Sequence, residues 1–276
     1  MDSSPPKPTS ETRTGLLGLL QRLTFDQWDA LVDDNPVQTG TRGEQRVVFF
    51  FFVLCSLVLL FNNDGATEMW RFMPFEYRQG TEEWRFWRRV TWALFVAVGY
   101  TLPTWWFCRR YLGLGLKDLG LTTRGFAKHL PMYVAFYCIV LPFVVWVSQE
   151  PHFEKTYPLN RVAHRRLDWL IIWELSYMVQ FIGVEFFFRG VLLQGPKKWL
   201  GAYTLPLMLI PYCMLHFQKP MLEALGSIIA GAALGMVAMR TGSILAGIGI
   251  HTAVAWTMDA LALWHRGDLQ RLLDSG

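Results

Sequence analysis

A set of ionisable residues lies inside apolar segments of this chain, where each needs a partner or a task. Glu185 and Arg189 occur in the run FIGVEFFFRG, and His216 and His251 occur in two later hydrophobic segments. An ionised side chain at the centre of a bilayer costs about 2.5–3.5 kcal/mol even on a lenient insertion scale. A carboxylate, a guanidinium and two imidazoles in such segments therefore predict one buried polar site that handles water or protons within a membrane.

Glu185 and Arg189 are four residues apart in a predicted helix, so their side chains share one face. There Arg189 can keep Glu185 ionised, although burial favours the neutral acid. An ionised, partly desolvated carboxylate beside a water molecule is a good general base. The alternative is a structural ion pair that ties the helix end to the membrane interface, and the pair alone does not decide between the two.

The two histidines differ in their sequence surroundings. His216 closes an apolar segment, where a lone histidine is usually a hydrogen-bonded residue of the interface. His251 lies several residues inside an apolar run, so its imidazole needs a buried hydrogen-bond partner. Glu185 and His216 are the natural candidates, which predicts that the three helices carrying these residues meet.

The composition is that of a protein that crosses a membrane several times. Only 17% of the 276 residues are charged, against about 25% in soluble domains, and 52% are hydrophobic. The charges cluster between long apolar runs. The net charge of +4 comes without a concentrated basic stripe, so the chain is not expected to bind nucleic acid.

A spanning helix needs about 20 mostly apolar residues, and seven segments come near that length. We therefore predict an all-α fold, a polytopic transmembrane bundle of about seven (six to eight) spanning helices. The predicted spans cover residues 47–61, 90–107, 130–147, 170–188, 200–217, 222–239 and 244–264. Small residues are dense in the sixth of these, which predicts close packing against the helices that carry the ionisable residues.

These spans divide the chain into four predicted regions. In order, they are a polar N-terminal tail with a candidate interfacial amphipathic helix, N-terminal transmembrane helices, a core that carries the ionisable residues, and a short polar tail: residues 1–46, 47–165, 166–265 and 266–276. The alternative for the N-terminal tail is a partly ordered cytoplasmic segment. The basic loop over residues 109–128 favours a cytoplasmic position for that loop and for the N-terminus.

No cofactor is predicted. The four cysteines lie in or beside apolar segments without a CxxC spacing, which argues against disulfides and against a zinc site. One glutamate and two histidines can ligate zinc, but the chain has no HExxH motif, so we favour a site without metal.

Three short motifs occur in order on successive apolar segments: EFFFRG from Glu185, YCMLH ending at His216, and HTAVA from His251. Together they resemble the signature of the CPBP family of intramembrane glutamic proteases, which includes the type II CAAX prenyl endopeptidases and the bacteriocin-processing and immunity proteins. That signature is Glu-Glu-x-x-x-Arg, then Phe-x-x-x-His, then His-x-x-x-Asn or Asp. The resemblance covers about residues 165–264, a third of the chain, and the EFFFRG form is similar to a bacterial variant.

The chain departs from the family pattern at three positions. Val184 replaces the first glutamate of the pair, so its water-activating role falls to Glu185 or is lost. Tyr212 replaces the phenylalanine of the second motif and adds a hydroxyl. Ala255 replaces the amide or carboxylate that would help to stabilise an oxyanion, a loss that can cost about 10²–10³ in rate.

The resemblance implies a metal-independent protease of the glutamic type. Glu185 would activate water, Arg189 would keep Glu185 charged, and His216 and His251 would orient the water or stabilise the oxyanion. Asp259, two turns after His251, is a candidate to orient that histidine.

The implied substrate is a membrane-anchored protein or peptide within the lipid bilayer. A bacterial member would cleave a C-terminal sorting or anchor segment at the inner (cell) membrane. A second hypothesis is a non-catalytic membrane scaffold or immunity-type protein on the same fold, which Val184 and Ala255 favour. A third is a small transporter or proton relay, because buried glutamate and histidine suit that task. The oligomeric state is not predicted.

Overall fold

The computed structural model describes residues 15–72 and 78–274, so the first part of the predicted N-terminal tail and the end of the C-terminal tail lie outside the described residues. Every regular element in this part of the chain is a helix, which confirms the predicted all-α class. Within it, five helices are long and apolar enough to cross a membrane. They are α3 (Arg42–Asn63), α5 (Phe126–Val147), α7 with its continuation η4 (Leu167–Leu192), α10 (Met221–Thr241) and α11 (Leu245–His265).

Helix α4 (Glu82–Phe107) covers the second predicted span and packs closely on α7. At their closest approach, a Cβ added to Gly183 would lie 2.6 Å from Ala97 Cα. Tyr100 of α4 stacks on Phe187, with ring centroids 4.7 Å apart. The absence of a side chain at Gly183 therefore lets the backbones of α7 and α4 approach closely.

Helix α9 (Thr204–Met214) is shorter than predicted. Its 11 residues give a length of about 16 Å, too short to cross a membrane, so the prediction of a full span over residues 200–217 is wrong. The residues before it instead form α8 (Lys197–Leu200) and the short turn η5 (Gly201–Tyr203). Gly201 permits this break, since it adopts a φ of 55° that few other residues accept.

The small residues of α10 face α9. A Cβ added to Gly231 would lie 2.9 Å from the Tyr212 ring, and one added to Gly235 would lie 2.4 Å from the Leu205 side chain. This confirms the prediction of close packing in that segment, and α9 is the helix that leads to His216.

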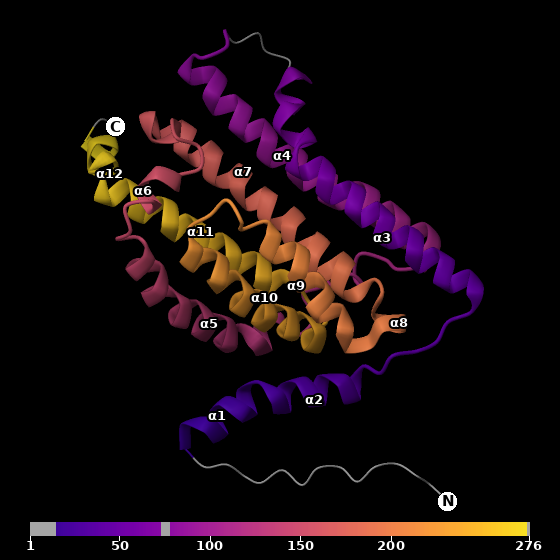
Figure 1. Ribbon diagram of the computed structural model, residues 1–276. Helices are drawn as coiled ribbons and strands as arrows, with labels where there is room; N and C mark the ends of the chain where they lie inside the picture. Colours follow the sequence, from indigo (N-terminus) through magenta and orange to yellow (C-terminus); the bar gives the residue numbers. More distant parts are fainter. Residues whose placement is uncertain (1–14, 73–77, 275–276) are drawn as a thin grey trace, which may run out of the picture.

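Helices α1 (Gly15–Leu23) and α2 (Phe25–Asp34) lie across one end of the main bundle (Figure 1), and α2 packs against its core. Leu31 of α2 is buried and Trp28 meets the Tyr203 ring edge-on at 5.8 Å. Helix α1 leaves its leucines uncovered: Leu16, Leu17, Leu19, Leu20 and Leu23. An exposed apolar stripe beside polar residues is what a helix lying in a membrane surface presents, so the interfacial interpretation remains the favoured prediction.

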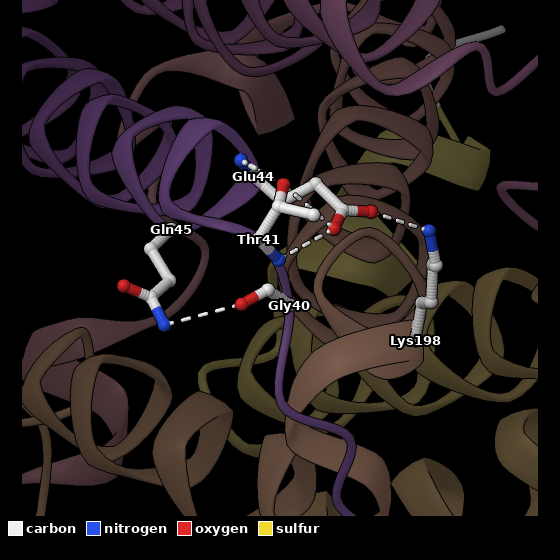
Figure 2. Close-up of polar contacts among 5 residues, drawn as sticks. All are labelled: Gly40, Thr41, Glu44, Gln45 and Lys198. Atoms are coloured by element: carbon white, nitrogen blue, oxygen red, sulfur yellow. Dashed lines mark hydrogen bonds and ion pairs between the residues drawn. The ribbon is translucent and has the colours of Figure 1, made fainter.

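A capping box fixes the start of α3 (Figure 2). Glu44 N donates to Thr41 Oγ1 at 3.3 Å, and Thr41 N donates to Glu44 Oε2 at 2.9 Å. Gln45 Nε2 donates to Gly40 O at 3.2 Å, and Lys198 Nζ lies 2.7 Å from Glu44 Oε1. The last contact joins the beginning of α3 to α8, the helix that follows η4.

Replacing Thr41 by alanine should lower the free energy of unfolding by about 1 kcal/mol, because α3 loses the acceptor for one of its free N–H groups. Thr41→Ser keeps the hydroxyl and should retain most of that stability. Thermal unfolding in detergent micelles measures the difference. Equal midpoints for Thr41→Ala and wild type would mean that the capping box adds nothing to stability.

Candidate active site

The predicted Glu–Arg pair lies where α7 changes its helical geometry. Glu185 is the last residue of α7 (Leu167–Glu185), and Arg189 belongs to the π-helical segment η4 (Phe186–Leu192). Short π-helical segments are rare and occur frequently at functional sites. Both side chains are fully buried, and Arg189 Nη1 donates to Glu185 Oε1 at 2.9 Å. The predicted shared face is therefore present.

His251 reaches the same carboxylate from α11. Its Nδ1 lies 3.0 Å from Glu185 Oε1, and its ring packs 4.2 Å from the ring of Phe181. The Glu185 carboxylate accepts, so Nδ1 carries the proton. Arg189 and His251 thus hold one oxygen of Glu185 between them, and the structure brings together three of the four residues predicted from the sequence.

His216 lies in the turn after α9 and is not bonded to the others. Its Nδ1 lies 3.1 Å from the carbonyl oxygen of Tyr212, one helical turn earlier, and no hydrogen bond joins it to Glu185 or His251 in the described chain. The Tyr212 ring is near both imidazoles, with its centroid 5.2 Å from that of His216 and 6.4 Å from that of His251.

Tyr212 is more central than its sequence position suggested. The guanidinium of Arg189 lies over its ring at 4.0 Å, a cation–π contact within the buried part of the site. Phe188 packs edge-on with the same ring, with centroids 5.3 Å apart. The Tyr212 ring therefore lies close to Arg189, His216 and His251.

Gly247 is a site residue that the sequence did not reveal. A Cβ at this position would lie 2.2 Å from Glu185 Oε2, so the carboxylate rests directly on the backbone of α11. Gly247 precedes His251 by four residues and shares its helix face. This spacing is the feature of the sequence that links Gly247 to the site.

Three buried polar atoms of the ion pair have no hydrogen-bond partner among the described residues: Glu185 Oε2, Arg189 Nε and Arg189 Nη2. Buried polar atoms are nearly always hydrogen bonded to protein, water or ligand. Glu185 Oε2 can therefore accept a proton, and Arg189 Nε and Nη2 can donate hydrogen bonds to a bound molecule.

Asp259 does not orient His251. Its Oδ2 accepts a hydrogen bond from Trp173 Nε1 at 2.9 Å, and the carboxyl group of Glu174 on α7 lies close enough to it to repel its charge. One oxygen of each carboxyl group, Glu174 Oε2 and Asp259 Oδ1, is buried without a hydrogen-bond partner among the described residues. Asp259 thus belongs to a pair of neighbouring acids with the half-buried Glu174, and the same argument from charges in apolar helices could have found this pair.

A third polar cluster lies beside His216, between the loop before α7 and the start of α10. Lys219 Nζ donates to Tyr157 Oη at 2.6 Å, and Tyr157 Oη donates to Glu223 Oε1 at 2.7 Å. Burial raises the pKa of Tyr157 and lowers the pKa of Lys219. Lys219 N also donates to His216 O at 3.0 Å, so this cluster fixes the turn that carries the histidine.

The two apolar departures from the family motifs are both buried. Val184 is 5% exposed and belongs to the main hydrophobic core, and Ala255 is 4% exposed and packs beside Phe181. Neither position offers a polar group to the site. Among the described residues, no group of three histidine, cysteine, aspartate or glutamate side chains is arranged to hold a metal ion.

Comparison with protein families gives a match over residues 166–257, to the model described as type II CAAX prenyl endopeptidase Rce1-like. The matched segment is about a third of the chain and contains all four predicted site residues. It confirms the resemblance inferred from the three motifs. The curated proteins and the solved structures gave no match.

Proposed function

We propose, on the premise that residues 166–257 form a protease segment of the Rce1-like family, that this integral membrane protein is a glutamic-type intramembrane endopeptidase. The observation that carries the proposal is the state of the Glu185 carboxylate. Arg189 and His251 both bind Oε1, and Oε2 is buried without a partner in the described chain. Such a carboxylate is held ionised and oriented, with one oxygen free to accept a proton.

The chemistry follows from that arrangement. Glu185 Oε2 accepts a proton from a water molecule while the water oxygen attacks the carbonyl carbon of the scissile bond. The carbonyl π electrons move to its oxygen, which becomes the oxyanion of a tetrahedral intermediate. When the intermediate collapses, the carbon–nitrogen bond breaks and the proton held by Glu185 passes to the leaving amine.

Donors for the oxyanion are available around Glu185. Arg189 Nε and Nη2 are unused by the described residues, and a protonated His251 would have Nε2–H free because Nδ1–H is bound to Glu185. His216, which is next to Tyr212 and not hydrogen bonded to Glu185, would meet the substrate rather than the carboxylate. No step requires a metal.

The proposed substrate is a membrane-anchored protein, and a C-terminal sorting or anchor segment suits a site buried between membrane helices. The reconstituted protein should be incubated with a pooled library of membrane-anchored peptides and the products read by mass spectrometry. New peptide termini, absent from protein-free liposomes, are expected. A library left intact by folded protein would contradict an endopeptidase with broad access to such segments.

The two histidines should differ in their effect on cleavage. His251→Ala removes a hydrogen bond to Glu185 and should lower the rate by about 10²–10³, while His216→Ala, which leaves the carboxylate contacts intact, should lower it less. His265→Ala, at the exposed end of α11, is the matched control and should be silent. A larger loss from His216→Ala than from His251→Ala would reverse the assigned roles.

A further inference from the structure

A cavity of about 210 Å³ lies at the end of the bundle where α4 begins and the chain approaches α7. Its polar lining is strongly basic and carries two tryptophans: Arg85, Arg88, Arg89, Arg161, Trp84 and Trp92. No aspartate or glutamate is among its described lining residues. It is separate from Glu185, because Glu185 lies at the opposite end of α7, roughly 27 Å along the helix axis.

None of the four guanidinium groups has a carboxylate partner among the described residues, and Arg85 donates to the carbonyl oxygen of Gly80. Arg88 lies over the Trp84 ring at 5.3 Å and Arg89 over the Trp92 ring at 5.0 Å. Neither of them, nor Arg161, forms an ion pair with a described residue, and Arg88 and Arg161 are close enough to Arg89 to repel its charge. The contacts of Arg88 and Arg89 with these rings use none of their N–H groups in hydrogen bonds. Their N–H donors therefore remain available to a ligand.

Two carboxylates near the cavity are bound to arginines that do not line it, and a third, Glu83, is exposed and forms no ion pair with a described residue. Glu82, at the start of α4, pairs with Arg165 at 3.5 Å, and Glu68 pairs with Arg71 at 2.8 Å. The cavity therefore concentrates positive charge that the described protein does not neutralise.

Trp84 gives an independent sign of a ligand. Its indole Nε1 is buried and has no hydrogen-bond acceptor among the described residues, although the ring lines the cavity. Buried indole N–H groups usually find an acceptor. An anion in the cavity would accept this hydrogen bond as well as those from the guanidinium groups.

We infer that this cavity binds a phosphate group, carried by an anionic phospholipid headgroup or by a small soluble phosphate compound. Arginine guanidinium matches phosphate oxygens with paired hydrogen bonds. Basic pockets between membrane helices bind lipid headgroups. Trp84 and Trp169, near the first residues of α4 and α7, are typical of the membrane interface, where such headgroups lie.

Native mass spectrometry of the whole protein in detergent tests this inference with phosphatidylglycerol and phosphatidylcholine as probes. Phosphatidylglycerol should form a tight one-to-one adduct with wild type, and Arg88→Gln/Arg161→Gln should weaken it by about tenfold or more. Arg88→Lys keeps the charge but loses the paired geometry and should be intermediate. Thermal shifts with inorganic phosphate, against chloride at equal ionic strength, test a soluble ligand.

Arg110→Gln is the matched control, because Arg110 also lies over an aromatic ring, that of Tyr111, at 5.3 Å, but outside the cavity. It should bind phosphatidylglycerol like wild type. A tight lipid adduct that inorganic phosphate does not displace identifies a headgroup, and displacement or stabilisation by phosphate identifies a soluble ligand. Equal binding of both probes by wild type and the double variant, or equal losses in Arg110→Gln, would overturn the inference. The inference that this cavity binds a phosphate group does not depend on protease activity.

Discussion

Glu185→Gln should abolish peptide hydrolysis while the protein stays folded in the membrane. The amide cannot accept a proton from water, and removal of a general base costs about 10²–10⁴ in rate. Its carbonyl oxygen can still accept the hydrogen bonds that Arg189 and His251 now give to Glu185 Oε1. The loss should therefore appear in cleavage of the peptide library, with a melting temperature close to that of wild type.

Glu174→Gln is the control for this substitution. Glu174 is a second carboxylate on the same helix with one buried oxygen, and the amide that replaces it is nearly the same size. Cleavage should survive in Glu174→Gln and disappear in Glu185→Gln. If folded Glu185→Gln cleaves as wild type does, the Rce1-like segment is not a Glu185-dependent protease. A library uncut by either protein would favour the non-catalytic scaffold, for which buried Val184 and Ala255 already argue.

The contacts of the buried charges were predictable from the sequence because a charged residue in an apolar helix has few alternatives. Glu185 and Arg189 had to share a face at a spacing of four, and His251 needed a buried partner for which Glu185 was a candidate. The structure contains both contacts. The same argument, applied to Glu174 and Asp259, would also have found the acid pair.

The position of His216 could not be predicted by the same argument. Hydropathy identifies an apolar segment but does not say where the chain stops being helical, and α9 ends at Met214 after 11 residues. The turn that follows directs His216 to its own helix and to Tyr212, so the contact of this ring with both imidazoles became visible only in three dimensions.

The role of Gly247 depends on how α7 and α11 cross, which local sequence does not specify. The chain has 23 glycines, and several lie in apolar helices. Only the contact of one of them with Glu185 Oε2 distinguishes it, and that contact joins residues far apart in the chain.

Gly247→Ala should therefore remove most of the activity without unfolding the protein. The new methyl group would lie 2.2 Å from Glu185 Oε2, so the carboxylate must move away from its hydrogen bonds. A displacement of about 1 Å in a catalytic group can cost about 10²-fold in rate. Initial rates of peptide cleavage, compared with thermal unfolding of the same sample, separate a displaced base from a damaged fold.

Gly249→Ala provides the matched control on the same helix. Nothing lies within 4 Å of a Cβ at this position, so activity should be unchanged and helix stability should rise slightly. Equal rates for Gly247→Ala and wild type would mean that the Glu185 carboxylate can shift without loss, and its observed position would not matter for catalysis.

A second substitution tests whether the clash itself causes the loss. Glu185→Asp shortens the side chain by one methylene and withdraws the carboxylate from α11, so alone it should also lower the rate. Combined with Gly247→Ala, it relieves the contact between the methyl group and the carboxylate. Two residues in contact are expected to be non-additive, so the double variant should lose less than the product of the two single losses. Additive losses would mean that Gly247 acts on activity by a route other than its contact with Glu185.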